Sequence, residues 1–323
     1  MTDIPTSSVN DAQRITVIMN PVAGLKSEAQ DIIKAYLAAL PDRQITYYFT
    51  EKKGDAVRFA QEAVAANAQV VLGYGGDGTM TEVAAGLQHS GVPMAILPGG
   101  TANVMAIELG IPIALQAALD LIFHQPNYAR SVDMGCIDNQ MFLLRAGIGY
   151  EAQLSATAPR AAKRERGRLA YFQHGFALLK KLRPARYKIT TGGKTYVVSG
   201  ITCMICNSTN VGINNLQLVH QSSVSDGLLD VVVIEGLGVK SLMRVFASIF
   251  QKLIPGRAAA PPAIRHWQVP EVTIEISPRQ LVAFDGEKLK YAKRVSAVVV
   301  PNAVLIIVPD GAPDSAKPVK GTL

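Results

Sequence analysis

The sequence has few cysteines, few charged residues and no long hydrophobic run. Three cysteines in 323 residues are too few, and odd in number, for a disulfide framework. No apolar run reaches the roughly 18 residues that a membrane-spanning helix needs. Residues 1–14 are polar and lack the apolar core of a signal peptide, so we expect a cytoplasmic protein.

Two of the cysteines, Cys203 and Cys206, have the CxxC spacing of some zinc and redox sites. They lie in the apolar run 201–206, which is typical of a β-strand, and no second pair accompanies them. We therefore expect buried thiols in a strand rather than metal ligands.

The residues that are abundant describe a well-packed globular protein: 49% are hydrophobic and 18% are charged. The length of 323 residues favours two domains. A net charge of +7 and a pI near 9.3 favour a polyanionic partner such as nucleic acid, anionic lipid or nucleotide. No nucleic-acid motif accompanies the basic residues, so we expect no nucleic-acid partner.

Strands and helices alternate in the first part of the chain, which predicts a parallel sheet flanked by helices. Ligands of such sheets collect beyond the carboxyl ends of the strands. The expected strands are 14–19, 44–50, 69–72 and 93–97, and the expected helices are 27–40, 55–66, 80–88, 101–108 and 115–123.

The second part reads mostly as antiparallel strands joined by turns such as Asp138-Asn139 and Gly192-Gly193. The expected strands are 128–134, 140–145, 187–191, 194–206, 229–235, 272–276, 281–284, 296–300 and 303–308. We therefore expect an α/β nucleotide-binding domain over 1–130, with 301–310 as a candidate last strand of its sheet, a β-sandwich-like lipid-substrate domain over 131–300 and a flexible tail over 311–323.

Two stretches in the second part, 159–183 and 240–257, combine basic side chains with an apolar helical face. Such helices can lie on an anionic bilayer, which would make the protein a peripheral membrane protein. Ordinary surface helices that pack on a sheet have the same pattern, and the sequence leaves both interpretations open.

A glycine-rich segment, 72–79, joins the apolar strand 69–72 to a helix. Glycines let backbone N–H groups approach phosphate oxygens, while Asp77 among them favours a bound Mg²⁺. The plain alternative is a tight turn with Thr79 as the helix N-cap. The segment also matches GxGxxG, but no acidic residue ends the next strand and no Walker motif occurs, so a dinucleotide fold is not favoured.

Two neighbouring strand ends carry similar residues, Asn20 to Gly24 after the first strand and Pro98 to Asn103 after the strand 93–97. Three ends of one parallel sheet would therefore supply glycine turns and small polar side chains to one place. Their convergence is more specific than any single motif.

Together with Thr50, Gly54-Asp55-Ala56, Asp226-Gly227 and Asp285-Gly286-Glu287, these motifs resemble the diacylglycerol kinase catalytic-domain family, above all its soluble bacterial lipid kinases. The resemblance spans residues 14–308. It implies a nucleotide-binding α/β domain, then a β-sandwich domain, with the active site in the cleft between them.

The resemblance implies the cofactors ATP and Mg²⁺ and gives roles to single residues. Glu287 would remove the proton from the lipid hydroxyl, and Asp77 and Asp285 are further candidate catalytic acids. A structural Mg²⁺ would bind Asp226 and the carbonyls of Ser223 and Leu228, although Asp-Gly is also a common turn. The candidate nucleotide-binding residues are Asn20, Thr50, Gly75, Gly76, Asp77, Gly78, Thr79, Met80, Thr81, Gly100, Thr101 and Asn103.

Three further positions qualify the resemblance. Asp133 matches an acidic family position near the catalytic metal. Val104 stands where many members have Asp, and Glu151 where Asp is commoner.

The sequence thus predicts a lipid kinase that transfers the γ-phosphoryl group of ATP to a hydroxyl of a membrane lipid such as diacylglycerol or phosphatidylglycerol. One alternative is a kinase for a soluble acceptor, above all NAD, because NAD kinases share the Gly-Gly-Asp-Gly-Thr turn. The other alternative, suggested by Val104, is a non-catalytic lipid-binding regulatory protein with the kinase fold.

Overall fold

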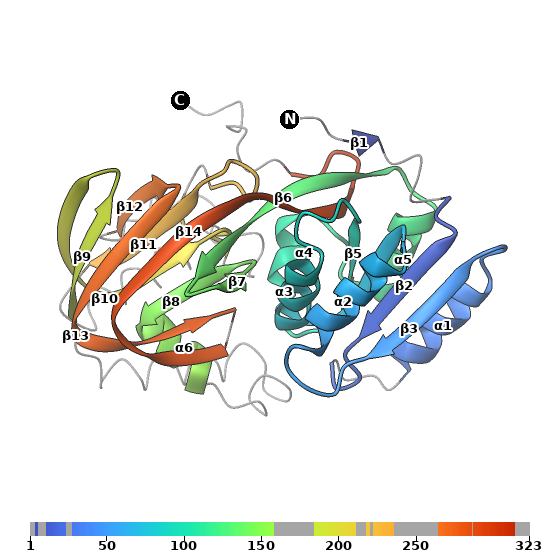
Figure 1. Ribbon diagram of the computed structural model, residues 1–323, viewed down its shortest axis with the longest axis horizontal. Helices are drawn as coiled ribbons and strands as arrows, with labels where there is room; N and C mark the ends of the chain where they lie inside the picture. Colours follow the sequence, from blue (N-terminus) through green and yellow to red (C-terminus); the bar gives the residue numbers. More distant parts are fainter. Residues whose placement is uncertain are drawn as a thin grey trace, which may run out of the picture. The chain divides into compact units, whose positions relative to one another are not determined.

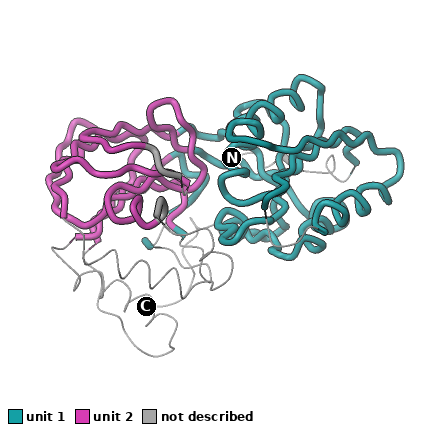
Figure 2. The backbone as a smooth tube through the Cα atoms, turned by 90° about the horizontal axis from the view of Figure 1, so that it is seen from below, with its two compact units in different colours: residues 1–134, 210–227, 300–323 teal, residues 135–209, 228–299 magenta. Residues whose placement is uncertain are grey.

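The computed structural model describes residues 4–5, 11–23, 28–157, 184–210, 218–219, 222–235, 264–285 and 287–313, with the side chains of all of these except 4–5, 155–157 and 287–289. The chain forms two compact units (Figure 2). Unit 1 comprises residues 1–134, 210–227 and 300–323, and unit 2 comprises residues 135–209 and 228–299. The domain bounds expected from the sequence stay a prediction.

Unit 1 contains a parallel sheet with the strand order β5-β4-β2-β3 (Figure 1). Its strands are β2 (Arg14–Met19), β3 (Gln44–Phe49), β4 (Val70–Gly75) and β5 (Met94–Pro98). Met19 lies opposite both Phe49 and Tyr74, and Gly75 lies opposite Pro98. The carboxyl ends of all four strands therefore meet at one edge of the sheet, as the alternation predicts.

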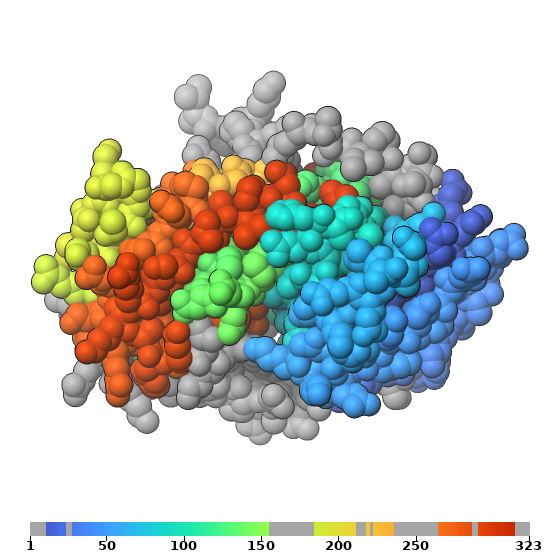
Figure 3. Space-filling model, in the orientation of Figure 1, coloured from blue at the N-terminus to red at the C-terminus, as the bar shows by residue number. Residues whose placement is uncertain are grey.

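Helices cover both faces of this sheet. Helices α1 (Ala29–Ala38) and α5 (Leu115–Phe123) pack on the face that carries Leu72 and Tyr74. Helices α2 (Asp55–Ala65) and α3 (Asp77–Gly86) lie side by side, and Met80 of α3 contacts Gly73 on the opposite face. Figure 3 shows the side chains of α2 (blue) and α3 (cyan) packed together on one side of unit 1.

Unit 2 contains antiparallel strands around one apolar core. The strand order is β12-β11-β10-β8-β13-β14, and β9 pairs with both β10 and β13. The core contains Tyr187, Ile205, Val231 and Ile274, all fully buried. The strands that begin and end in this unit are β7 (Gln140–Phe142), β8 (Arg145–Gly149), β9 (Ala185–Thr191), β10 (Lys194–Cys206), β11 (Leu229–Glu235), β12 (Ile264–Val269) and β13 (Glu271–Phe284).

Two strands continue from one unit into the other. Strand β6 (Asn127–Ile137) pairs with β1 (Ile4–Pro5) and β7, and β14 (Glu287–Pro309) pairs first with β13. Further along β14, Ile306 lies parallel to Met94 of β5. The expected strands 296–300 and 303–308 are therefore parts of one long strand.

The fold class expected from the sequence is confirmed, whereas some elements differ. The expected strands 272–276 and 281–284 form one strand, β13, whose pairing with β14 shifts between Glu275 and Gln280. The expected strand 140–145 divides into β7 and β8. Helices α4 (Val104–Glu108) and α1 are shorter than expected, and β12 and α6 (Tyr150–Thr157) had no sequence prediction.

The prediction of buried strand thiols is confirmed. Cys203 and Cys206 are both buried on β10, and burial raises the pKa of both thiols. Since they are three residues apart in a strand, they lie on opposite faces of the sheet and do not share one metal ion. Among the described residues, no group of three or more His, Cys, Asp or Glu side chains is placed to hold a metal ion.

Within the described ranges, no helix is long and apolar enough to cross a bilayer. The two basic stretches, 159–183 and 240–257, lie outside the described residues, as does the end of the expected tail, 314–323.

Candidate functional site

The glycine-rich segment of unit 1 is tighter than the sequence suggests. Strand β4 runs through Gly75, and α3 begins at Asp77 with Gly76 as its N-cap. A Cβ on Gly75 would lie 2.6 Å from the Thr79 side chain, so only glycine allows this reversal between strand and helix. The alternative of a Thr79 N-cap is wrong, because Thr79 already lies in the first turn of α3.

The second glycine turn packs directly on the first. A Cβ on Gly100 would lie 2.6 Å from the Cα of Gly76, and the N–H of Gly99 donates to the carbonyl of Gly75 at 2.8 Å. Asn103, with φ of 48°, closes this turn because its side chain accepts the N–H of Gly100 at 2.8 Å and donates to the carbonyl of Gly100 at 3.0 Å. Two glycine-lined backbones therefore share one surface.

Asp77 and Asn20 connect the turns through side chains. Oδ1 of half-buried Asp77 accepts the backbone N–H of Met105 in α4 at 3.3 Å. Nδ2 of Asn20, which follows β2, donates to Oγ1 of Thr79 at 3.2 Å. The first turn of α3 has no side-chain cap, so its N–H groups and positive dipole end suit an anion.

The other candidate nucleotide-binding residues differ in accessibility. A Cβ on Gly78 would meet no atom within 4 Å, so backbone there is open to a ligand. Thr101 is exposed, and half-buried Thr50 follows β3 with its N–H bonded to the carbonyl of Met19 at 2.9 Å. Met80 and Thr81 are buried. Nucleotide contacts by any of these residues stay a prediction.

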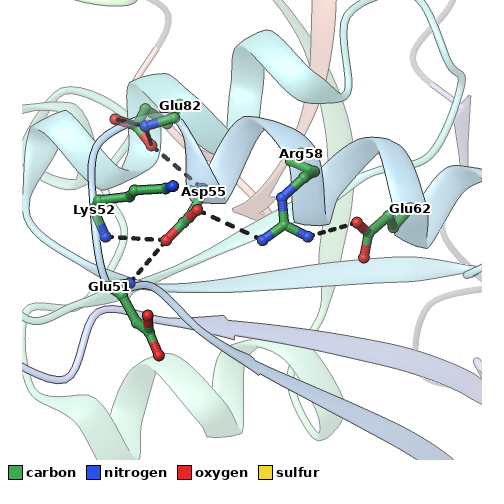
Figure 4. A network of polar contacts seen from close by, with 8 residues as sticks. Glu51, Lys52, Asp55, Arg58, Glu62 and Glu82 are labelled. Atoms are coloured by element: carbon green, nitrogen blue, oxygen red, sulfur yellow. Dashed lines mark hydrogen bonds and ion pairs between the residues drawn. The ribbon is translucent and has the colours of Figure 1, made fainter.

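Two carboxylates, Asp55 and Glu82, hold the loop between β3 and α2 (Figure 4). Asp55 was part of a sequence motif without an assigned role, whereas Glu82 was not predicted from the sequence. Asp55 accepts the N–H groups of Glu51 and Lys52 at 2.9 and 3.0 Å, and these hydrogen bonds lower its pKa. Glu82 of α3 accepts the N–H groups of Gly54 and Ala56 at 3.1 and 3.3 Å. The local signal for the loop was Gly54 before a helix, but nothing local pointed to Glu82.

In unit 2, Asp285 lies in a backbone cradle at the link between β7 and β8. Its carboxylate accepts the N–H of Leu143 at 2.8 Å and those of Leu144 and Arg145 at 3.1 Å. Its own N–H donates to the carbonyl of Arg145 at 3.0 Å. The hairpin that places Glu287 opposite Phe284 is therefore fixed by Asp285, and the side chain of Glu287 lies outside the described residues.

Arg145 and Glu151 form an ion pair next to this cradle, with Nε of Arg145 3.7 Å from Oε1 of Glu151. A Cβ on Gly147 would overlap the Glu151 carboxylate, so glycine at 147 leaves the space that this side chain fills. The N–H of Glu151 donates to Oγ1 of Thr202 at 3.3 Å. Glu151 is therefore held over the backbone of β8.

The candidate metal loop, 223–228, is tied to β6 by Asp133. Oδ2 of Asp133 accepts the N–H of Gly227 and Oδ1 accepts that of Asn302, both at 2.7 Å, while burial raises the pKa of Asp133. Ser223 is buried, Leu228 is half-buried and Asp226 is exposed. One carboxylate and two carbonyl oxygens are donors that suit Mg²⁺, so the donor chemistry fits the predicted ion.

Two family models match the chain. The model described as the diacylglycerol kinase catalytic domain matches residues 14–137, and the model described as the YegS C-terminal NAD kinase beta sandwich-like domain matches residues 145–308. The chain belongs to the diacylglycerol kinase catalytic-domain family and carries the YegS-type C-terminal domain. The resemblance stated from the motifs is therefore confirmed.

Related proteins include lipid kinases by name. A Bacillus subtilis protein named "Diacylglycerol kinase" is 27% identical over 85% of this chain and 90% of its own length. A Pseudomonas aeruginosa protein named "Probable lipid kinase YegS-like" is 28% identical over 89% of this chain and 93% of its own. An uncharacterized protein of Synechocystis is 30% identical, and the match covers 84% of this chain and 65% of that protein.

Solved structures show the same fold. A diacylglycerol kinase from Bacillus anthracis matches with a TM-score of 0.67 at 22% identity, covering 94% of this chain and 99% of that one. A second crystal structure from the same organism gives a TM-score of 0.77 at 24% identity and covers 96% and 100% of the two chains.

Proposed function

We propose that the protein is an ATP-dependent lipid kinase that phosphorylates a hydroxyl group of a membrane lipid. The observation that carries the proposal is the pair of glycine turns in backbone contact at Gly76 and Gly100, joined by Asp77 and closed by Asn103. Such a surface offers N–H groups and a helix N-terminus to phosphates. Membership of the family supports a kinase, and the names of the relatives support a lipid as the acceptor.

In the proposed reaction, Glu287 takes the proton of the lipid hydroxyl while its oxygen attacks the γ-phosphorus of ATP. A new P–O bond forms, the bond to the β-phosphate oxygen breaks, and ADP leaves. Bound Mg²⁺ would neutralise charge on the phosphates, with Asp77 as the proposed acid beside it. Asp285 would hold the turn that presents Glu287, a role that its three backbone hydrogen bonds support.

The test uses purified protein, Mg²⁺, γ-labelled ATP and vesicles that contain diacylglycerol, phosphatidylglycerol, ceramide or a long-chain base in separate reactions, with NAD⁺ in a further reaction. We expect a labelled lipid whose mass is increased by one phosphate. Labelled NADP⁺ would instead support the soluble acceptor. ATP-dependent transfer to none of these would favour the non-catalytic regulatory protein.

Glu287→Gln should slow lipid phosphorylation by about 10²- to 10⁴-fold, as expected for the loss of a general base. The affinity for ATP should stay unchanged, which equilibrium binding of a fluorescent ATP analogue can measure. Wild-type turnover in this variant would remove Glu287 from the mechanism.

We also propose that the protein binds the surface of a bilayer as a peripheral membrane protein. The proposal rests on the net charge of +7 and on the basic stretches 159–183 and 240–257. Sedimentation with vesicles of phosphatidylglycerol, compared with phosphatidylcholine, tests it: we expect binding to the anionic vesicles that falls at high salt. Equal recovery with both lipids would contradict the proposal.

A further inference from the structure

The loop between β3 and α2, residues 50–54, is held by carboxylates from two different helices (Figure 4). Asp55 holds the loop from the start of its own helix, α2, and Glu82 holds it from α3. Asp55 is 5% exposed, and its bonds to Glu51 and Lys52 close a local turn. The contribution of Glu82 is different because it joins two elements that are 26 to 28 positions apart in sequence.

Glu82 acts as the cap that α2 lacks. The N-cap residue of α2 is Gly54, with φ of 87° and no side chain to accept the first N–H groups. Both carboxylate oxygens of Glu82 lie 3.1 Å from the N of Gly54, and Oε2 lies 3.3 Å from the N of Ala56. A negative charge at this helix end is also favoured by the helix dipole.

Close packing of the two helices keeps Glu82 in place. Gly86 lies one turn after Glu82 on α3, and a Cβ there would lie 2.5 Å from the carbonyl oxygen of Val57 and 2.6 Å from Cβ of Ala60. The backbones of α2 and α3 therefore meet directly. Glu82 and Gly86 lie on the same face of α3. The contact at Gly86 sets the distance between α2 and α3, and the contact of Glu82 holds the loop.

We propose that Glu82 is a positioning residue for nucleotide binding. It fixes the loop that begins at Thr50 relative to the first turn of α3, which contains Asp77 to Thr79. The inference rests on the proposed function, since Thr50 and this turn are candidate ATP contacts. A loop that is already ordered in the free protein loses less conformational entropy when ATP binds. The affinity for ATP is therefore higher.

The contact of Glu82 also gives the N-termini of α2 and α3 different roles. The N-terminus of α2 already holds the Glu82 carboxylate, and a phosphate group there would meet its negative charge. The first turn of α3 begins after Gly76 and carries a carboxylate of its own, Asp77. In the proposed function, Mg²⁺ beside Asp77 would offset its charge, whereas no cation is proposed beside Glu82, so α3 is the proposed phosphate site and α2 is not.

Amide hydrogen exchange in the free protein tests the contact itself. In Glu82→Ala, exchange should become faster at Gly54 and Ala56, and Glu82→Gln should restore part of the protection because its side-chain oxygen still accepts. Glu275→Ala is the control: Glu275 lies on β13 in unit 2 and pairs with Lys188 at 3.1 Å, with 52% of its side chain exposed. Unchanged exchange in Glu82→Ala would overturn the inference.

Steady-state kinetics test whether Glu82 affects the use of ATP. In Glu82→Ala, the KM for ATP should rise about tenfold, which corresponds to about 1.4 kcal/mol, with Glu82→Gln between the variant and wild type. The kcat and the KM for lipid should stay within about twofold, and Glu275→Ala should have the same KM for ATP as wild type. A fall in kcat without a change in the KM for ATP would overturn the positioning role.

Equilibrium binding of Mg-ATP separates this inference from the proposed function. If wild-type protein does not bind ATP, the proposed function is wrong and the inference falls with it. If wild-type protein binds ATP and Glu82→Ala binds it equally well, the inference alone is wrong.

Discussion

Clusters of backbone N–H groups have opposite uses in the two units. In unit 2, three consecutive N–H groups, those of Leu143 to Arg145, all donate to the carboxylate of Asp285. In unit 1, the first turn of α3 begins after a glycine and has no side-chain cap. The same chemistry binds an internal anion in unit 2, and we propose that it binds an external anion, the phosphates of ATP, in unit 1.

The start of α2 shows that this difference does not come from the type of element. It is a helix N-terminus in unit 1, yet Glu82 fills it as Asp285 fills the cradle in unit 2. A helix end by itself therefore does not mark an anion site, because a carboxylate from another element can occupy it. We propose α3 as the phosphate site because its glycine N-cap, Gly76, meets the second glycine turn at Gly100.

The largest effect should come from adding a methyl group where the glycine turns meet. Gly100→Ala places Cβ 2.6 Å from the Cα of Gly76, and such overpacking against backbone should cost about 1–3 kcal/mol of unfolding free energy. It should also weaken ATP binding, because the two turns must separate. Urea unfolding and ATP titration measure the two effects.

Gly78→Ala is the matched control for this variant. A Cβ at Gly78 meets no atom within 4 Å, and alanine is the better helix former, so stability should stay equal or rise by up to about 1 kcal/mol. If both variants unfold at the same urea concentration, the two turns are not in the contact described.

A smaller effect should distinguish a paired from an unpaired tyrosine hydroxyl. Tyr36 in unit 1 donates to Asp120 at 2.8 Å, so Tyr36→Phe should cost about 1 kcal/mol. The hydroxyl of Tyr187 in unit 2 is buried and has no hydrogen-bond partner among the described residues, so Tyr187→Phe should be neutral or stabilising by about 1 kcal/mol. Urea unfolding measures both variants, and a loss of stability in Tyr187→Phe would show that this hydroxyl is paired.

The smallest effect should appear as a pH dependence at Asp55. Hydrogen bonds from Glu51 and Lys52 lower its pKa from 3.8, so its ionised form stabilises the folded state above that value. The contribution is lost as the pH falls through the folded-state pKa. Asp55→Asn should therefore be less stable than wild type at pH 7, and the difference should shrink below pH 3.8. A difference that does not change with pH would contradict this account.

Local patterns predicted several elements of both units with their exact bounds, β2 and α5 in unit 1 and β10 and β11 in unit 2, because apolar periodicity marks them directly. They misplaced the end of β4, which was expected at residue 72 and lies at Gly75. Residues 140–145 read as one strand, since nothing near them indicates that a carboxylate 140 to 142 positions later divides it at Leu143 and Leu144. Glu82 was missed for the same reason, because its partners lie in another helix.

The sequence by itself determined the family, the alternation that makes a parallel sheet, and the glycines at its strand ends. These features depend on residues that are close in sequence, and glycine is needed wherever a Cβ would collide, as at Gly75 and Gly100. Only the tertiary structure decided which N–H clusters are filled, by Asp285 at Leu143 and by Glu82 at Gly54. Whether a backbone anion site is occupied depends on a side chain brought from another element, and packing places that side chain.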